Sequence, residues 1–424
     1  CGQQDLCVVP AVNPVIPGDH PDPHVLRDLD PNGDPVFYLV HTVHNADDIP
    51  IYRSGDLIHW ELMPDRAFGR ARTPGHSLDV NGGHFCSVWA PHLNRIRSGL
   101  YLLGFSASRF PSAQEPCPAY AEDGGVYLAS SSAPTGPYAT VEHAWEPFPA
   151  GANKTSCPAD VRQQIPRSVD YASPNCQNGY CHQVIRLDSD VFFDPLSGRW
   201  WLAYSWFTNS PPMVPWEETN HGEHLHITEL DPDDPFAVLC DPDLPQIFAA
   251  NPHDAATRAL LASYCPRCAQ MLSFTRSRYG EEFLRDGYSW GVTEGASLFR
   301  RGDWVYLLVS GSLWDSAYYH VYWVAAPDVA QLVYSNPDRL VGRYLIPSQQ
   351  QAFGHGSAVL GPDGEHWYFV HHRLDSSACA GQGDCSRDVW VSPIEFEDRG
   401  DGLGQVYIRP RFPSETPEVE VVQP

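Results

Sequence analysis

Short runs of alternating hydrophobic and polar residues fill most of the chain, and one arrangement of them recurs five times. Each copy has a polar residue, an apolar strand, a turn that carries glycine or charge, and a second strand rich in aromatic residues. Turn pairs such as Asn32-Gly33 and Ser197-Gly198 separate the two strands, as in tight β-hairpins. The pattern therefore predicts five hairpins, in the copies that begin at Asp22, Ala90, Asp188, Glu294 and His355.

Hairpins repeated along one chain are typical of a β-propeller, in which each repeat becomes a blade. Later strand-like segments, starting at Ile49, Gly125 and Tyr318, would bring blades to four strands. We therefore expect an all-β fold, a five-bladed β-propeller. The uneven spacing between copies predicts long loops that decorate one face, at 109–123, 145–185 and 208–287.

No second hydrophobic core is indicated outside the repeats, although 424 residues could hold more than one domain. We expect a single catalytic domain over residues 1–424. Within it, 1–12 is predicted to be an N-terminal arm tied by a disulfide, and 386–424 a C-terminal closing segment.

Composition and net charge limit the classes of partner that this chain could bind. The 40 prolines and 33 glycines favour many turns and short strands over long helices. The net charge of −25, without a Lys/Arg-rich patch, argues against nucleic-acid binding and, more weakly, against strongly anionic polysaccharides. A neutral substrate suits this charge better. The sequence has no apolar run of about 18 residues or more, so no membrane span is expected.

The twelve cysteines point to an oxidising compartment, and hence to a secreted protein. A zinc or redox site at Cys265 and Cys268 is the rival interpretation, but no second pair follows at ligand spacing. The leading Cys1 suggests that an upstream segment is removed, and it would also suit lipoprotein anchoring. Short disulfides are predicted for the cysteines that lie close together: Cys1 and Cys7, Cys176 and Cys181, Cys265 and Cys268, and Cys379 and Cys385.

A polar residue at the start of each repeat is the main candidate for chemistry. In a propeller the first strand of each blade lies nearest the axis, so residues at equivalent starts converge on one funnel. Taken from the five repeats, this ring consists of Asp22, His92, Asp188, Glu294 and His355.

Crowded carboxyls in a concave site acquire separate pKa values, so that one serves as an acid and another as a base. Glycoside hydrolysis needs this division of roles. Any one of these acids could instead cap a hairpin or join two blades. Three of them at equivalent positions favour catalysis, because buried unpaired carboxyls would otherwise only cost stability.

The motifs around this ring resemble glycoside hydrolase family 43. They include HPDP around Asp22, LDSDVFFD around Asp188, TEGASLF around Glu294 and GHGS around His355. The resemblance implies an inverting mechanism in which Asp22 is the general base, Glu294 the general acid, and Asp188 a carboxylate that tunes the acid's pKa. An inverting pair is expected about 6.5–9.5 Å apart.

The resemblance also implies contacts around the carboxyls. Arg373 resembles an arginine that reaches a sugar hydroxyl, although a surface ion pair is an alternative for it. His92 stands where the family commonly has aspartate, which leaves the accepted sugar open. Four more residues lie near the motifs or the predicted mouth of the funnel and could bind sugar, with core packing as the alternative for the tryptophans: His44, Trp89, Trp206 and Trp290.

No cofactor is required by the proposed chemistry. The resemblance places His355 near the axis, where it could face a Ca²⁺ or Na⁺ ion through water, but a structural histidine fits the sequence nearly as well. We expect a monomer that acts on an oligo- or polysaccharide.

The sequence leaves three alternatives for the function. The DPNG string at Asp30 resembles a motif of fructan-cleaving propellers, but it lies in a hairpin turn. A non-catalytic glycan-binding propeller is the alternative class, and the three intact carboxyls favour an enzyme. Among enzymes, terminal α-L-arabinofuranosyl residues of plant-type polysaccharide are the first expectation, with β-xylosidase or galactan- or galactofuranose-active hydrolase as the others.

Overall fold

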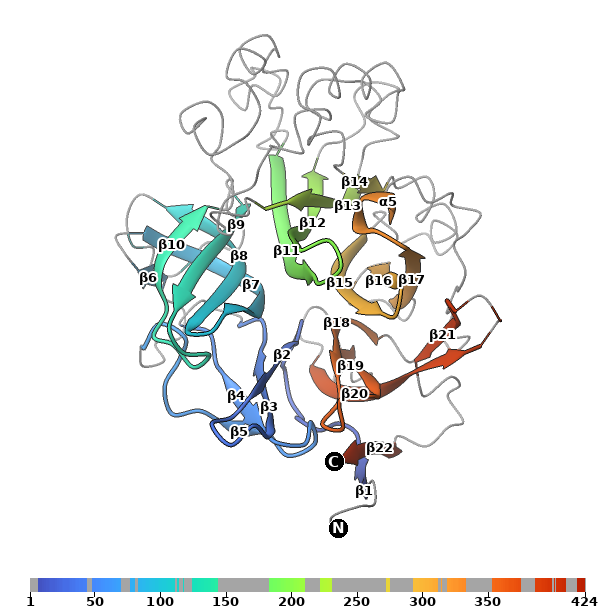
Figure 1. Cartoon of the computed structure of the whole chain (residues 1–424). Helices are drawn as coiled ribbons and strands as arrows, with labels where there is room; N and C mark the ends of the chain where they lie inside the picture. Colours follow the sequence, from blue (N-terminus) through green and yellow to red (C-terminus); the bar gives the residue numbers. More distant parts are fainter. Residues whose placement is uncertain are drawn as a thin grey trace, which may run out of the picture.

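The computed structural model shows a β-propeller with strands arranged in sheets around a central axis (Figure 1). The described part contains no helix long and apolar enough to cross a membrane. The structure describes residues 7–43, 48–69, 77–80, 83–110, 113, 117, 124–143, 183–209, 222–230, 272–274, 293–311, 314, 319–332, 353–374, 386–398, 400, 402–408 and 418–423.

The first three sheets follow one another along the chain, each antiparallel. The first contains β2 (His24–Leu29), β3 (Pro35–Val40), β4 (Tyr52–Ser54) and β5 (Glu61–Leu62). The second contains β6 (Leu78–Val80), β7 (Gly83–Arg97), β8 (Leu100–Phe110), β9 (Gly124–Ser131) and β10 (Ala139–His143). The third contains β11 (Gln183–Asp194), β12 (Arg199–Asn209), β13 (Gly222–Glu229) and β14 (Leu272–Phe274).

Two further sheets complete the ring. One has β15 (Thr293–Arg301), β16 (Trp304–Gly311) and β17 (His320–Ala326), and the short helix α5 (Val329–Leu332) follows it. The other has β18 (Phe353–Leu360), β19 (Trp367–Leu374), β20 (Arg387–Glu397) and β21 (Gln405–Ile408). Separately, β1 (Cys7–Val12) pairs with β22 (Glu418–Gln423), so the two ends of the chain lie together.

The propeller prediction is confirmed by the way the innermost strands meet. Strands β2, β7, β11, β15 and β18 contact one another in sequence, and β18 returns to β2. Four of the sheets have the four or more strands of a complete blade, and the β15–β17 sheet has three among the described residues. Buried apolar side chains fill the spaces between neighbouring sheets, for example Phe37 with Val370 and Phe299 with Phe369.

Each innermost strand contains, or closely follows, a residue in left-handed backbone conformation that marks the start of the repeat. These residues are Asp22, Ala90, Asp188, Gly295 and His355, with φ between 41° and 60°. In four of the innermost strands, β7, β11, β15 and β18, a shift in strand register accompanies the left-handed residue, as in a β-bulge. Such a bulge redirects the local side chain, so in these four strands it aims residues away from the regular pleat.

Backbone N–H groups at these starts join each blade to the one before it. Ala90 N donates to Thr42 Oγ1 (2.7 Å), Asp188 N to Ser106 Oγ (2.8 Å) and His355 N to Ser310 Oγ (2.7 Å). Asp22 N donates to His372 Nδ1 (3.0 Å). The acceptors stand at matching positions on the second strands, so a repeating hydrogen bond fixes where the start of each blade lies.

In a second layer of such bonds, the acceptors lie on the innermost strands, two residues after the left-handed positions. Here His24 Nδ1, Asp190 Oδ2, Ser297 Oγ and Ser357 Oγ accept backbone N–H groups from the next blade. His92 stands at the equivalent position of β7, two residues after Ala90, but its Nδ1 pairs with Asn94 of the same strand. Its side chain is 1% exposed, and it lies against Gly104, where a Cβ would come within 1.9 Å of its ring. The predicted contact of His92 with sugar is therefore not supported, because the imidazole has no surface to offer.

Ser357 gives a direct test of this second layer. The Ser357→Ala variant leaves the buried N–H of Val25 without its 2.8 Å acceptor, which should lower the free energy of unfolding by about 1–3 kcal/mol. The control Ser197→Ala removes a hydroxyl that donates to Asp194 at an exposed turn, and should cost no more than about 1 kcal/mol. Denaturant unfolding compares the two, and equal losses would contradict the role given to Ser357.

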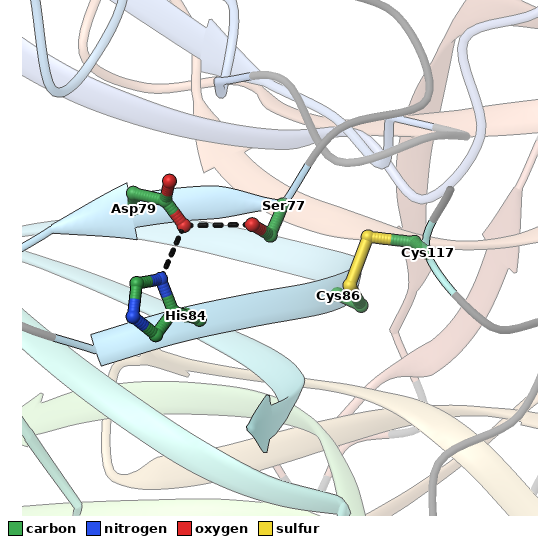
Figure 2. Close-up of a disulfide and its surroundings, with 5 residues drawn as sticks. All are labelled: Ser77, Asp79, His84, Cys86 and Cys117. Atoms are coloured by element: carbon green, nitrogen blue, oxygen red, sulfur yellow. Dashed lines mark hydrogen bonds and ion pairs between the residues drawn. A yellow bond between two sulfur atoms is a disulfide. The ribbon is translucent and has the colours of Figure 1, made fainter. Parts of the chain in front are cut away.

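A disulfide that the sequence did not predict joins Cys86 of β7 to Cys117 (Figure 2). Beside it, Asp79 Oδ1 accepts a hydrogen bond from Ser77 (2.7 Å) and lies 2.7 Å from His84 Nδ1. The contact between Asp79 and His84 ties β6 to the part of β7 that precedes Ala90. The predicted short disulfides all include cysteines outside the described residues.

Candidate active site

Asp22 is held from several elements at the start of the first blade. Its Oδ2 accepts a hydrogen bond from Thr42 Oγ1 (2.6 Å). Its Oδ1 lies 3.2 Å from His372 Nδ1, 3.3 Å from His355 Nδ1 and 3.5 Å from Arg387 Nη1. Burial alone would raise the pKa of Asp22, but the charges of His355 and Arg387 outweigh burial and hold this pKa well below its usual range. The carboxyl is therefore kept ionised.

The pKa of Glu294 is shifted in the opposite direction from that of Asp22. It is buried at the start of β15, and Tyr319 donates a 2.7 Å hydrogen bond to its Oε1. Burial raises the pKa of Glu294, and the negative charge of Asp22 adds to this, whereas His355 and Tyr319 lower it. The net pKa is raised, so this carboxyl retains its proton to higher pH than an exposed glutamate.

Asp188 and His355 stand between these two groups. His355 Nδ1 is 3.3 Å from Asp22 Oδ1 and 4.0 Å from Asp188 Oδ2. One oxygen of Asp188, one of Glu294 and one ring nitrogen of His355 lie within 4.8 Å of one another. Close approach of β15 to His355 requires glycine at position 295, since a Cβ there would meet the imidazole at 2.9 Å. The structure thus brings the three predicted carboxyls together around one histidine.

Asp188, Glu294 and His355 also lie close enough together to face a cation. Ca²⁺ takes about six to eight oxygen ligands, whereas this cluster offers two carboxylate oxygens and a nitrogen that already faces Asp22. The described residues therefore fit a channel cation poorly, and no step of the chemistry below uses one.

The structure describes three of the other five residues predicted to contact sugar. Arg373 is half-buried and stacks on Trp390, with 4.2 Å from its guanidinium carbon to the ring centre, and burial lowers its pKa to about 10. Trp89 lies half-buried on β7 opposite Ser106. The backbone of Trp206 belongs to β12, while His44 and Trp290 lie outside the described residues.

Four site residues were missed from the sequence: Thr42, Tyr319, His372 and Arg387. Thr42 lies two residues beyond β3 and His372 lies within β19. In the segments YLVHT and YFVHH both residues align with Ser106 and Ser310 of other blades. Aligning the second strands as well as the first would have found these two. Arg387 comes from the predicted closing segment, and no local pattern connects it with Asp22.

Comparison with known proteins identifies the family of this chain. The sequence profile of Glycosyl hydrolases family 43 matches residues 11–152 and 270–401, well over half of the chain. The chain is 28% identical over 109 residues to xylosidase/arabinosidase 43B of Humicola insolens, and 26% identical over 126 residues to the non-reducing end alpha-L-arabinofuranosidase BoGH43B of Bacteroides ovatus. These matches cover 26% and 30% of this chain, and 19% and 20% of the relatives, so they span only about a fifth of the relatives' length.

Solved structures share the fold at low identity. A thermostable family-43 glycoside hydrolase superposes with a TM-score of 0.59 at 17% identity, covering 96% of this chain and 98% of the other. An α-L-arabinofuranosidase from Lactobacillus brevis gives a TM-score of 0.53 at 16% identity, covering 93% and 95%. With the propeller and its three carboxyls in place, the profile match shows that the chain belongs to glycosyl hydrolases family 43.

Proposed function

We propose that this protein is an inverting glycoside hydrolase that removes terminal α-L-arabinofuranosyl residues from plant-type polysaccharide. The observation that carries the proposal is that Asp22 and Glu294 both lie close to His355, with the pKa of Asp22 lowered and that of Glu294 raised. A pair with one ionised and one protonated carboxyl is what acid–base hydrolysis of a glycoside needs.

In the proposed reaction Asp22 accepts a proton from a water molecule while the water oxygen attacks the anomeric carbon. Glu294 gives its proton to the glycosidic oxygen as the bond from that oxygen to the anomeric carbon breaks. Attack from the side opposite the leaving group inverts the configuration. Asp188, within 4.8 Å of Glu294, is assigned to tuning the acid and orienting the sugar.

Two neighbours of Asp22 have supporting roles. Thr42 donates to Oδ2, which leaves Oδ1 as the oxygen surrounded by His355, His372 and Arg387. Burial lowers the pKa of His372 to about 4, so its neutral Nδ1 can accept the N–H of Asp22 at working pH. The base is thereby held in place by its backbone and by its side chain.

Arabinofuranose is favoured as the sugar because the relatives from Bacteroides ovatus and Lactobacillus brevis are named arabinofuranosidases. The name of the Humicola insolens relative includes xylosidase, which makes β-xylosides the second candidate. We further propose action outside the cell, which agrees with the disulfide between Cys86 and Cys117.

A panel of p-nitrophenyl glycosides tests the substrate. We expect kcat/KM for the α-L-arabinofuranoside to exceed that for the β-D-xylopyranoside by at least about tenfold, a difference of about 1.4 kcal/mol in transition-state binding. A preference for the xyloside would replace arabinofuranose by xylose within the same mechanism. Absence of hydrolysis of every glycoside, together with measurable binding of arabino-oligosaccharides, would favour the non-catalytic glycan-binding alternative.

A further inference from the structure

Tyr319 contacts the candidate acid directly, although it lies outside the repeated strand starts. It immediately precedes β17 and is buried. Its hydroxyl donates to Glu294 Oε1 at 2.7 Å. This gives one oxygen of the carboxyl a fixed partner within the protein.

The ring of Tyr319 is fixed as firmly as its hydroxyl. It stacks on the imidazole of His372, with ring centres 5.5 Å apart and planes within 6° of parallel. It also lies against Gly354, where a Cβ would come within 2.4 Å of its Cε1 atom. Because His372 contacts Asp22, the stacked pair connects the acid side of the site with the base side.

Because Tyr319 donates this hydrogen bond, it affects which oxygen of Glu294 holds the proton. Burial, and then the charges of Glu294 and Asp22, raise the pKa of Tyr319 well above its ordinary value, so the phenol stays a donor. A phenol donates better to the carbonyl-type oxygen of a protonated carboxyl than to its hydroxyl oxygen. With Oε1 taken as that acceptor, the proton of Glu294 belongs on Oε2.

We infer that Tyr319 is a positioning residue for the acid, which orients the Glu294 carboxyl so that Oε2 presents its proton to the glycosidic oxygen. This inference rests on the proposed role of Glu294 as general acid. The other titratable groups facing Glu294 are His355, Asp22 and Asp188.

The Tyr319→Phe variant tests the inference, because it removes the hydroxyl and keeps the ring on His372. The probes are aryl α-L-arabinofuranosides, or β-xylosides if the wild type prefers them, with leaving groups from 2,4-dinitrophenol to phenol. We expect kcat/KM to fall about tenfold for the phenyl glycoside, which needs protonation, and less than about twofold for the dinitrophenyl glycoside. The alkaline limb of the pH profile should move to higher pH, since losing a donor to the carboxylate raises the pKa of Glu294.

Tyr306→Phe is the matched control, because Tyr306 is a buried tyrosine of the same sheet whose hydroxyl donates to the Leu403 carbonyl, away from the acid. It should leave both the leaving-group dependence and the alkaline limb unchanged. An equal loss for all leaving groups in Tyr319→Phe, with an unmoved alkaline limb, would reduce Tyr319 to a packing role. If instead Glu294→Gln hydrolyses the phenyl glycoside at the wild-type rate, the proposed acid itself is wrong, whatever Tyr319→Phe does.

Discussion

The Asp22→Asn variant is expected to lower kcat/KM by about 10³–10⁴-fold on every substrate that the wild type cleaves. The amide keeps the shape of the side chain and cannot take a proton from water. Because the loss concerns the attacking water, it should be similar for good and poor leaving groups. Steady-state kinetics with the dinitrophenyl and phenyl glycosides measures it.

The control for this variant is Asp34→Asn, which removes one exposed carboxylate from the turn of the same hairpin. It should keep wild-type kinetics. A thermal melt should show that Asp22→Asn remains folded, because its loss of activity is informative only in a folded protein. Loss of less than about tenfold in folded Asp22→Asn would remove Asp22 as the base.

The Glu294→Gln variant should lose about 10²–10⁴-fold in kcat/KM for the phenyl glycoside and much less for the dinitrophenyl glycoside, which departs without protonation. Its pH profile should also lack the alkaline limb. In the wild type that limb arises because activity falls as Glu294 loses its proton, at a pH raised by burial. The acid limb, where Asp22 becomes protonated, should remain and should lie at low pH because the pKa of Asp22 is depressed.

Glu229→Gln is the matched control, since Glu229 is also 8% exposed but pairs with Arg199 in another blade. This variant should retain the alkaline limb. If the limb persists in Glu294→Gln as well, another group supplies the proton.

The hairpins and their propeller arrangement could be predicted from the sequence, because each blade repeats its own period-two pattern and turn. The alignment of the site residues between blades could be predicted only in part. The left-handed residues align Ala90 and Gly295 with Asp22, Asp188 and His355, whereas the sequence pattern aligned His92 and Glu294. A bulge adds residues that an alternating pattern does not reveal.

Glu294 and His92, the two residues that the sequence pattern misaligned, differ in whether they reach the site. Glu294 is one residue before Gly295 and still reaches His355 and Asp188. His92 is two residues after Ala90 and is buried, with its Nδ1 paired to Asn94 of the same strand. A polar residue that lies only two positions after the aligned residue therefore no longer reaches the site.

The environment of the carboxyls could not be predicted, because it depends on residues far apart in the sequence. Tyr319 and Arg387 carry no motif of their own, and they reach the acid and the base only after the ring of sheets has closed. The opposite pKa shifts of Glu294 and Asp22 depend on these contacts and on burial, so the assignment of acid and base could not follow from residue type alone.

The central claim is that Asp22 and Glu294 act from opposite faces of the sugar, and the configuration of the first released sugar tests it most directly. Proton NMR during the early turnover of an α-L-arabinofuranoside should show β-L-arabinofuranose appearing first, before mutarotation produces the other anomer. If α-L-arabinofuranose appears first, configuration is retained, and the inverting acid–base assignment of Asp22 and Glu294 is contradicted.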